Sequence, residues 1–306
     1  MIGWIHHATL RVRTVDEAMA RWSRLLGLTG ERAGDGALLR CAYEDYCLEL
    51  IPAGDADPGI EHVAWELRAE IGLGAAGELL AERGADPEEI EVPVRGRGLR
   101  VVDPEGRAMV TLERRRPEDR WPPVARSTDT LPAFHPRKLG HVNYLTADVK
   151  GMVEWYQRVL GFAVTDWIAD EGCWLHVNRD HHVLALSEQG YSHIHHLAFE
   201  LVDWGEMRVG LDHLGQHGRP LTWGPGRHAM AQNLFAYWRM PEEDLFVEFF
   251  CDLEQLDSDH EVRRFPDDPH ASNVWGILPP RSYFRFDEEA IRSEAAQQAA
   301  RPTRTP

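Results

Sequence analysis

The sequence predicts an α+β protein made of tandem strand–helix–strand–strand–strand (βαβββ) modules arranged in two homologous domains. The main observation is an internal repeat: His7 aligns with His141 and His62 with His196 at one shift of 134 positions (141 − 7 = 196 − 62 = 134). The same shift aligns Trp-Ser-Arg-Leu-Leu-Gly, which begins at Trp22, with Tyr-Gln-Arg-Val-Leu-Gly. Agreement at a single shift over these polar, apolar and glycine positions favours a tandem duplication.

A helix follows the first strand of each half, over residues 15–26 and 149–160. In the second of these helices, apolar residues recur at helical spacing, at positions 149, 152, 153, 156 and 160. Gly27 and Gly161 come directly afterwards, and glycine is the usual residue at a helix C-terminus.

The rest of each half repeats the same order of elements. Short strands are predicted around 37–51 and 173–187, and a second helix over about 71–83 and 204–217. Two final strands then form a hairpin, over 99–113 and 234–250, and Asp-Pro-Glu-Gly at 103–106 is a turn signal in the first hairpin.

These elements predict four parts of the chain. Residues 1–115 form an N-terminal module pair and residues 138–251 a C-terminal one. The intervening segment 116–137 is rich in proline and charge, which is typical of a linker. Residues 252–306 are predicted to form a lid segment over a site, followed by a frayed tail that begins near Ser293.

Composition narrows the class of function. The net charge of −17 argues against a nucleic-acid partner and against an anionic membrane surface. No apolar run is long enough to span a bilayer, and the N-terminus lacks the pattern of a signal peptide, so a cytoplasmic location is the default. The four cysteines form no CxxC pair, which fits a reducing compartment.

Two histidines and one glutamate of the second half form a candidate metal centre. His141, His196 and Glu248 each lie in a short strand-like apolar segment. A carboxylate in such a segment is costly to bury unless it is paired or bound to a cation. Two imidazoles and one carboxylate leave coordination positions open, and this is the ligand set of non-haem Fe(II) sites that activate oxygen.

The first half provides an internal comparison for this centre. His7 and His62 occupy the equivalent positions, but aligning the two final hairpins puts Val110 near the position of Glu248. Valine cannot bind a metal, and Glu113 lies three residues further on, at the end of the strand. The N-terminal module pair is therefore predicted to be a metal-free structural copy.

Three further residues of the second half are candidate catalytic groups. His182 lies in Asp-His-His-Val-Leu, His228 ends Gly-Pro-Gly-Arg-His, and Tyr237 lies in Asn-Leu-Phe-Ala-Tyr. Neutral histidine can take up and release protons near pH 7, so His182 is the candidate acid/base. The neighbouring residues His181, His193 and His195 are predicted to face the other way, as structural or solvent-exposed groups.

The module order resembles the vicinal oxygen chelate (glyoxalase-like) superfamily. Within it, the ordered set of histidines, tyrosine and glutamate resembles the type I extradiol ring-cleaving dioxygenases, the catechol 2,3-dioxygenase and 2,3-dihydroxybiphenyl 1,2-dioxygenase group. One departure is an extra residue in the loop before Glu248.

The resemblance implies a mononuclear Fe(II) centre, with Mn(II) as the alternative ion, held by His141, His196 and Glu248. It implies that a catechol-type substrate is cleaved with O₂ to a muconic semialdehyde-type product. It further implies that Tyr237 hydrogen-bonds the bound catecholate, that His228 orients the same side of the substrate, and that the chain forms a homo-oligomer.

Two other functions stay open at this point. One is a glyoxalase-like metal-dependent lyase or isomerase, and the other is a non-enzymatic, resistance-type protein that binds an aromatic ligand. Trp174, His176, Trp223 and Phe250 are candidates for the pocket wall. Arg263 and Arg264 either pair with a carboxylate-bearing catechol or are solvated surface groups, and the second reading is favoured.

Overall fold

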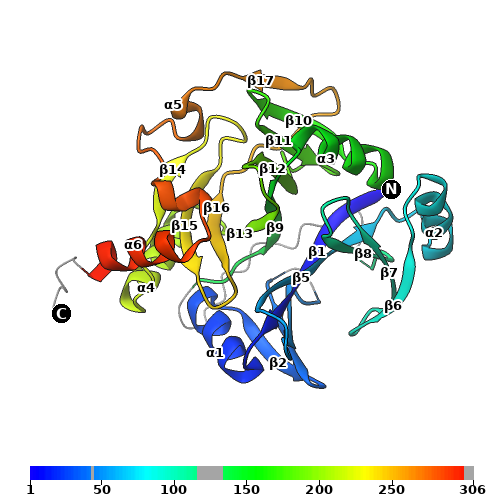
Figure 1. Cartoon of the computed structure of the whole chain (residues 1–306), viewed down its shortest axis with the longest axis horizontal. Helices are drawn as coiled ribbons and strands as arrows, with labels where there is room; N and C mark the ends of the chain where they lie inside the picture. The colour runs from blue at the N-terminus through cyan, green and yellow to red at the C-terminus, as the bar shows by residue number, and fades with distance from the viewer. Residues whose placement is uncertain (43–44, 116–133, 300–306) are drawn as a thin grey trace.

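The computed structural model describes residues 1–42, 45–115 and 134–299. Each half of the chain forms one curled, mixed β-sheet (Figure 1). The predicted tandem βαβββ fold is confirmed. Most of the predicted linker, residues 116–133, lies outside the described residues, as do residues 300–306 at the C-terminus.

The N-terminal sheet has the strand order β2-β3-β4-β1-β5-β8-β7-β6. Its elements are β1 (Ile2–Val12), α1 (Val15–Leu26), β2 (Thr29–Ala33), β3 (Gly36–Arg40), β4 (Leu48–Pro52), β5 (Gly59–Leu67), α2 (Leu73–Glu82), β6 (Glu88–Val92), β7 (Gly96–Val102) and β8 (Ala108–Leu112).

The C-terminal sheet has the order β14-β15-β16-β13-β9-β12-β11-β10-β17. Its elements are β9 (Lys138–Thr146), α3 (Val149–Trp155), a π-helical turn (Tyr156–Leu160), β10 (Ala163–Ile168), β11 (Gly172–His176), β12 (Leu184–Glu188), β13 (His193–Glu200), α4 (Trp204–Gln216), β14 (Trp223–Arg227), β15 (Leu234–Met240), β16 (Leu245–Cys251) and the short edge strand β17 (Arg263–Phe265).

The first helix of each half ends where the sequence predicts. Gly27 and Gly161 both adopt the left-handed conformation, with φ of 71° and 75°, which a residue with a Cβ adopts only at a cost. Asp148 begins α3, and its carboxylate accepts a hydrogen bond from the amide of Gly151 at 2.9 Å. The predicted helix over 149–160 changes to π-helical winding for its last five residues.

Aromatic side chains join the two halves into one continuous core. Trp22 of α1 is fully buried, and its ring lies 6.3 Å from that of Phe199 in β13. On the other side, Trp65 of β5 contacts Phe162 edge to face, at 5.1 Å between ring centres. The two sheets therefore fix each other's position through apolar contacts.

The C-terminal segment adds α5 (Pro269–Ser272), a 3₁₀ turn (Arg281–Phe284) and α6 (Glu288–Ala299), which lie beside β14 and β15 (Figure 1). The last helix continues past Ser293, where the sequence predicted a frayed end. Glu294 explains the difference, because its carboxylate accepts hydrogen bonds from Thr222 and, at 3.1 Å, from Arg239 of β15.

Two further sequence expectations can be compared with the fold. All four cysteines are buried free thiols, in agreement with a chain without disulfides. Among the described residues, no helix combines the length and apolar composition that crossing a membrane requires.

Gly140 provides a test of packing beside the candidate metal centre. An added Cβ there would overlap the buried ring of Phe250, so we expect Gly140→Ala to lower the free energy of unfolding by about 1–3 kcal/mol. The measurement is urea denaturation of the metal-free protein. Gly74→Ala in α2 is the control, because a Cβ there meets no atom within 4 Å; unfolding free energies reduced equally in both variants would contradict the packing argument.

Candidate metal centre and its cavity

Three adjacent strands bring His141, His196 and Glu248 together. In the sheet order, β13 lies between β9 and β16, and Ala198 of β13 pairs with His141 on one side and with Glu248 on the other. His196 lies two residues before Ala198 and therefore projects from the same face of the strand. Residues 107 positions apart in sequence are neighbours for this reason.

The three side chains form a compact buried group. Oε2 of Glu248 lies 2.9 Å from Nε2 of His141 and 3.2 Å from Nε2 of His196. The other carboxylate oxygen accepts a hydrogen bond from Nδ2 of Asn233 at 3.1 Å. Burial by itself opposes ionisation of Glu248, but the adjacent imidazoles of His141 and His196 outweigh it and hold the pKa of Glu248 well below its ordinary value.

Hydrogen bonds determine which nitrogen of His196 faces the centre. Nε2 of the neighbouring His195 donates to the backbone carbonyl of Tyr283 at 2.6 Å. Burial lowers the pKa of His195 well below its ordinary value, so that ring is neutral and its Nδ1 can only accept. Nδ1 of His196, at 2.7 Å, must then be the donor, and its Nε2 carries a lone pair.

These residues fit a divalent transition-metal ion. Nε2 of His196 is buried without a hydrogen-bond partner among the described residues, although a carboxylate oxygen is close by. A bound cation would use this lone pair and would neutralise the buried carboxylate of Glu248. The two-histidine, one-carboxylate set is the one that Fe(II) and Mn(II) accept.

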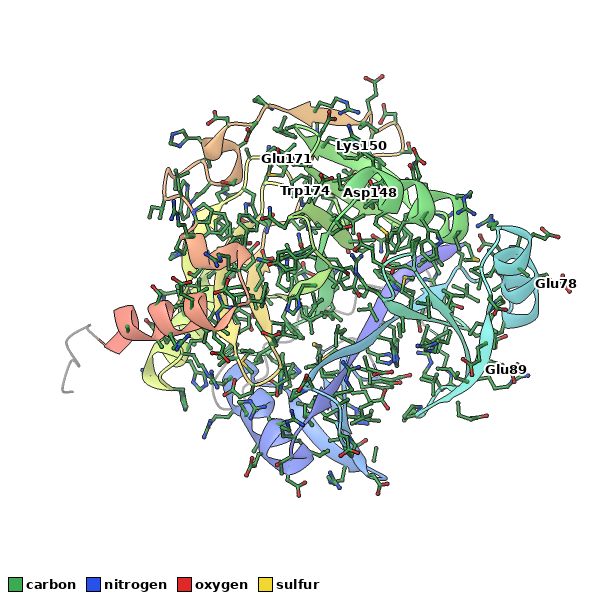
Figure 2. All side chains as sticks on the ribbon, in the orientation of Figure 1. Glu78, Glu89, Asp148, Lys150, Glu171 and Trp174 are labelled. Atoms are coloured by element: carbon green, nitrogen blue, oxygen red, sulfur yellow. The ribbon has the colours of Figure 1, made fainter. Side chains whose placement is uncertain are left out.

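All six residues predicted for the site line one cavity of about 240 Å³. Its wall is largely apolar and aromatic and includes Ile168, Trp174, Ala185, Trp223, Met230 and Tyr283. Figure 2 shows Trp174 and Glu171, two residues of the cavity wall, beside the strands of the C-terminal half. Of the other suggested wall residues, His176 and Phe250 do not line the cavity.

His228 and Tyr237 form a pair on one side of the cavity. Nδ1 of His228 donates to the backbone carbonyl of Ser272 at 2.6 Å, so its Nε2 accepts from the hydroxyl of Tyr237 at 3.1 Å. Burial lowers the pKa of His228 to about 4, which keeps this ring neutral. Burial and the nearby Glu248 carboxylate raise the pKa of Tyr237 well above its ordinary value, so its hydroxyl keeps its proton.

His182 lies on the other side, next to His141. The centres of the two rings are 4.2 Å apart. Burial and the surrounding histidines lower the pKa of His182 well below its ordinary value, so the ring is neutral. Its Nδ1 lies 3.1 Å from Nδ1 of His181, which leaves Nε2 as the nitrogen available to the cavity.

Several residues that position this site were not predicted from the sequence. Of the two predicted alternatives for His181 and His195, burial excludes solvent exposure and leaves a structural role, and His195 also contributes to the cavity wall; His193 is half-buried. The lid segment contributes the carbonyls of Ser272 and Tyr283 and the ring of Tyr283. Arg263 and Arg264 do not line the cavity; Arg263 pairs with Asp166 and Glu254, and Arg264 pairs with Asp170.

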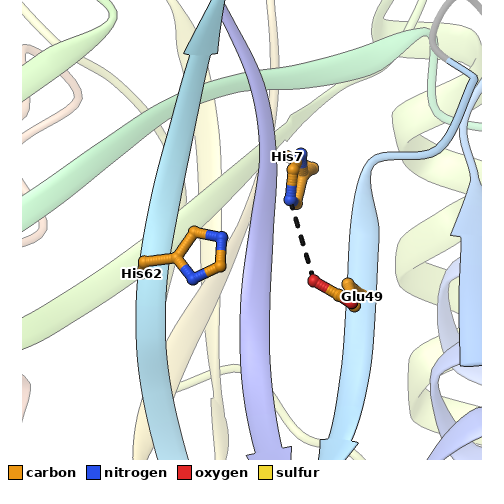
Figure 3. A group of neighbouring side chains, drawn as sticks. All are labelled: His7, Glu49 and His62. Atoms are coloured by element: carbon orange, nitrogen blue, oxygen red, sulfur yellow. Dashed lines mark ion pairs between the residues drawn. The ribbon is translucent and has the colours of Figure 1, made fainter. Parts of the chain in front are cut away.

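The N-terminal sheet contains a related cluster, His7, Glu49 and His62 (Figure 3). Val110 pairs with Ala64 as Glu248 pairs with Ala198, so the predicted equivalence of Val110 and Glu248 is confirmed. The carboxylate in this cluster comes instead from β4, on the opposite side of β1. Glu49 was not predicted from the repeat, because the C-terminal half has no acidic residue at the equivalent position.

Hydrogen bonds in this cluster place the protons of His7 and His62 on the Nε2 atoms that face Glu49 and Thr9. Thr9 donates to Glu49 at 2.7 Å, so at 3.1 Å it accepts from Nε2 of His62. Nη1 of Arg95 can only donate to Nε2 of His6, at 2.9 Å, and neutral His6 then donates from Nδ1 to Nδ1 of His7.

His7 consequently carries its proton on Nε2, which lies 3.9 Å from Glu49. In this arrangement, neither Nε2 of the cluster offers a lone pair to a metal. That the N-terminal module pair is metal-free stays a prediction, but it now rests on this proton arrangement rather than on Val110 alone.

Comparisons with known proteins agree with the fold. Residues 138–246 match the family model of the Glyoxalase/Bleomycin resistance protein/Dioxygenase superfamily. Metapyrocatechase 2 of Cupriavidus necator is 31% identical over 123 residues, a match that covers 40% of this chain and 38% of that relative. The manganese-dependent 2,3-dihydroxybiphenyl 1,2-dioxygenase of Geobacillus genomosp. 3 is 23% identical, over 80% of this chain and 83% of that relative.

Solved structures give the same fold over nearly the whole chain. The Mn(II)-bound glyoxalase of Novosphingobium aromaticivorans superimposes with a TM-score of 0.79 and 24% identity, covering 94% of this chain and 95% of that one. BphC, a halotolerant catechol dioxygenase, has a TM-score of 0.76 and 21% identity, covering 92% and 96%.

Metal content provides a test that separates the two clusters. We expect about one divalent metal ion per chain after loading with Mn(II) and gel filtration, because, of the two clusters, the C-terminal one presents an Nε2 lone pair next to its buried carboxylate and the N-terminal one does not. Glu248→Gln is expected to abolish retention, whereas Glu49→Gln is expected to leave it unchanged. Elemental analysis measures both, and loss of metal in Glu49→Gln alone would show that the clusters have been assigned the wrong way round.

Proposed function

We propose that the chain is an extradiol dioxygenase, a proposal supported by the match of residues 138–246 to the family model of the Glyoxalase/Bleomycin resistance protein/Dioxygenase superfamily. It cleaves the aromatic ring of a catechol-type substrate with O₂ at a mononuclear Fe(II) or Mn(II) centre. The product is a muconic semialdehyde-type compound.

One observation carries this proposal. The buried triad of His141, His196 and Glu248 opens into a cavity whose other polar groups include His182, His228 and Tyr237. A ring-cleaving site needs a metal, an acid/base and a hydrogen-bonding group around one flat apolar slot. The cavity volume of about 240 Å³ lies below the roughly 300–1,000 Å³ typical of drug-sized ligands and suits a single-ring substrate.

When bound, the metal ion would supply a Lewis acid that favours the deprotonated catechol and a place where catechol and dioxygen meet. The triad also favours this function over a glyoxalase-like lyase. Its three ligands come from β9, β13 and β16 of one half, and no residue of the N-terminal half lines the cavity within the described part of the chain.

His182 is the proposed acid/base. Its ring is neutral, and its Nε2 is free to accept the proton of a catechol hydroxyl as the substrate binds. The same nitrogen can return that proton at a later step. Because the ring is packed against His141, a proton held on it stays within reach of a substrate next to the metal.

Tyr237 and His228 act on the substrate from the other side. The hydroxyl of Tyr237 donates to His228, which leaves its oxygen able to accept a hydrogen bond from a catechol hydroxyl. His228 is held by the carbonyl of Ser272 and therefore fixes the direction of this hydroxyl. Trp174 and Trp223 contribute aromatic surface to the cavity wall against which a substrate ring can pack.

The reaction can be tested directly on protein loaded anaerobically with Fe(II) or Mn(II). Admitting air with a panel of catechols is expected to consume about one O₂ per catechol and to form a yellow ring-cleavage product. His182→Phe is expected to keep its metal and to lose about 10²–10⁴-fold in kcat, because it removes the acid/base but no ligand.

Metal-loaded protein that consumes no O₂ with any catechol in the panel would contradict the proposal. In that case, turnover of a glutathione hemithioacetal would support the lyase alternative. Tight binding of an aromatic ligand by metal-free protein, without turnover, would support the binding-protein alternative.

The charges around the cavity favour an uncharged catechol. Among the described residues that line it, none is Lys or Arg, whereas Glu171, Asp267 and Asp268 are present. Arg263, the candidate partner for a substrate carboxylate, is held by Asp166 and Glu254. An anionic substituent would therefore meet like charges at the wall and find no counter-ion.

We accordingly expect kcat/KM to be higher for 3-methylcatechol than for 3,4-dihydroxyphenylacetate, by about tenfold or more. Rising salt is expected to narrow the difference, because exposed charges are screened. Replacing Asp267 and Asp268 by Asn is expected to improve the carboxylate-bearing substrate selectively. A preference for the acid in the unchanged protein would show that these charges do not control selection.

A further inference from the structure

A line of buried hydrogen bonds runs from the back of the cavity to His182. Nε2 of His181 lies 2.7 Å from Oδ2 of Asp166, and Nδ1 of His181 lies 3.1 Å from Nδ1 of His182. All three side chains are buried, at 0–3% exposure, so solvent does not compete for these bonds. No step of the proposed reaction uses Asp166 or His181 directly.

The direction of each hydrogen bond in this line, that is, which atom donates, follows from Asp166 at the end away from the cavity. The carboxylate of Asp166 can only accept, so Nε2 of His181 carries the proton. Neutral His181 then has a bare Nδ1, which can only accept from Nδ1 of His182. His182 is thereby held with its proton on Nδ1 and with the lone pair of Nε2 available to the cavity.

Asp166 is itself fixed as an acceptor. Nε and Nη2 of Arg263 bind its two oxygens at 2.9 and 2.8 Å. Burial opposes ionisation, but the hydrogen bonds from His181 and Arg263 outweigh it and lower the pKa of Asp166. Thr165 holds the backbone carbonyl of His181 at 2.7 Å, which limits movement of this residue.

The N-terminal half contains the same unit with the opposite direction. His6 and His7 also meet through their Nδ1 atoms, at 2.6 Å, but a donor, Arg95, stands behind His6 in place of a carboxylate. The inner ring, His7, consequently keeps its proton on Nε2. In such a pair of adjacent histidines, the residue that hydrogen-bonds the outer ring therefore determines which nitrogen of the inner ring carries the proton.

We propose that Asp166 and His181 are positioning residues that hold His182 in the Nδ1–H tautomer and aim its Nε2 lone pair at the substrate. The catalytic consequence rests on the proposed function of His182. The tautomer itself does not, because it is a property of the folded chain that can be measured without turnover.

The tautomer can be read from two-bond ¹H–¹⁵N correlation spectra of protein labelled at histidine and loaded with diamagnetic Zn(II). The signals of His182 are identified by their loss in His182→Phe. We expect the Nδ1–H pattern in the unchanged protein. Asp166→Asn, whose amide can donate to His181, is expected to populate the Nε2–H form, and His181→Phe, which removes the acceptor, is expected to give a mixture.

Glu254→Gln is the matched control. Oε2 of Glu254 lies 3.9 Å from Nε2 of His181, so the change removes a nearby negative charge without touching the 2.7 Å bond. The tautomer and kcat are expected to stay unchanged in this variant. If Glu254→Gln changed the His182 tautomer and kcat as much as Asp166→Asn does, the negative charge of Asp166 alone, and not its hydrogen bond to His181, would explain the effect. That result would overturn the proposal.

Kinetics provide the second measurement. With Fe(II)- or Mn(II)-loaded protein and catechol, Asp166→Asn and His181→Phe are expected to lower kcat by about 10–100-fold, with KM and bound metal little changed. An Nε2–H pattern for His182 in the unchanged protein, or an Nδ1–H pattern that survives in both variants, would overturn the proposal. If no catechol is cleaved, the proposed function fails, and the spectra alone still decide the tautomer.

Discussion

The pairing of β13 with β9 on one side and β16 on the other is the constraint on which the whole site depends. It places His141 and Glu248 at the two ends of one row across the sheet, with Ala198 between them. A shift of one residue in either pairing would turn a ligand to the opposite face of its strand. The register is held by apolar residues on the covered face, including Leu197 and Phe199, which are fully buried.

Much of this arrangement could be predicted from the sequence because it repeats. The shared spacing of His7 and His62 with His141 and His196 identified two equivalent pairs of strands, and a glutamate within an apolar strand identified the third ligand. His182, His228 and Tyr237 were found through their order along the chain. Tyr237 lies on β15, where alternation along the strand determines the direction of the side chain, whereas His182 and His228 lie just outside the ends of β12 and β14.

The remaining parts of the site depend on contacts that no local pattern encodes. Ser272 and Tyr283 act through backbone carbonyls, which every residue possesses, so their sequence positions carry no signal. Asp166 lies in a short strand and His181 in a loop, and their local sequence gives no sign that both side chains are buried in the folded chain. Glu49 was overlooked because the N-terminal carboxylate comes from a different neighbouring strand than its C-terminal counterpart.

The contrast between Arg95 and Asp166 has an evolutionary consequence. If the halves arose by duplication of a metal-binding module, and if the N-terminal half is metal-free as predicted, the hydrogen bonds that surround His7 and His62 would make the loss of its metal site hard to reverse. Restoring glutamate at position 110 alone would place a carboxylate beside two imidazoles that both present protons. Recovery would also require changes at Arg95 and Thr9, and each of these alone leaves a buried polar group without its partner. On this prediction, several substitutions together would be needed before the N-terminal half could bind a metal through Glu at position 110.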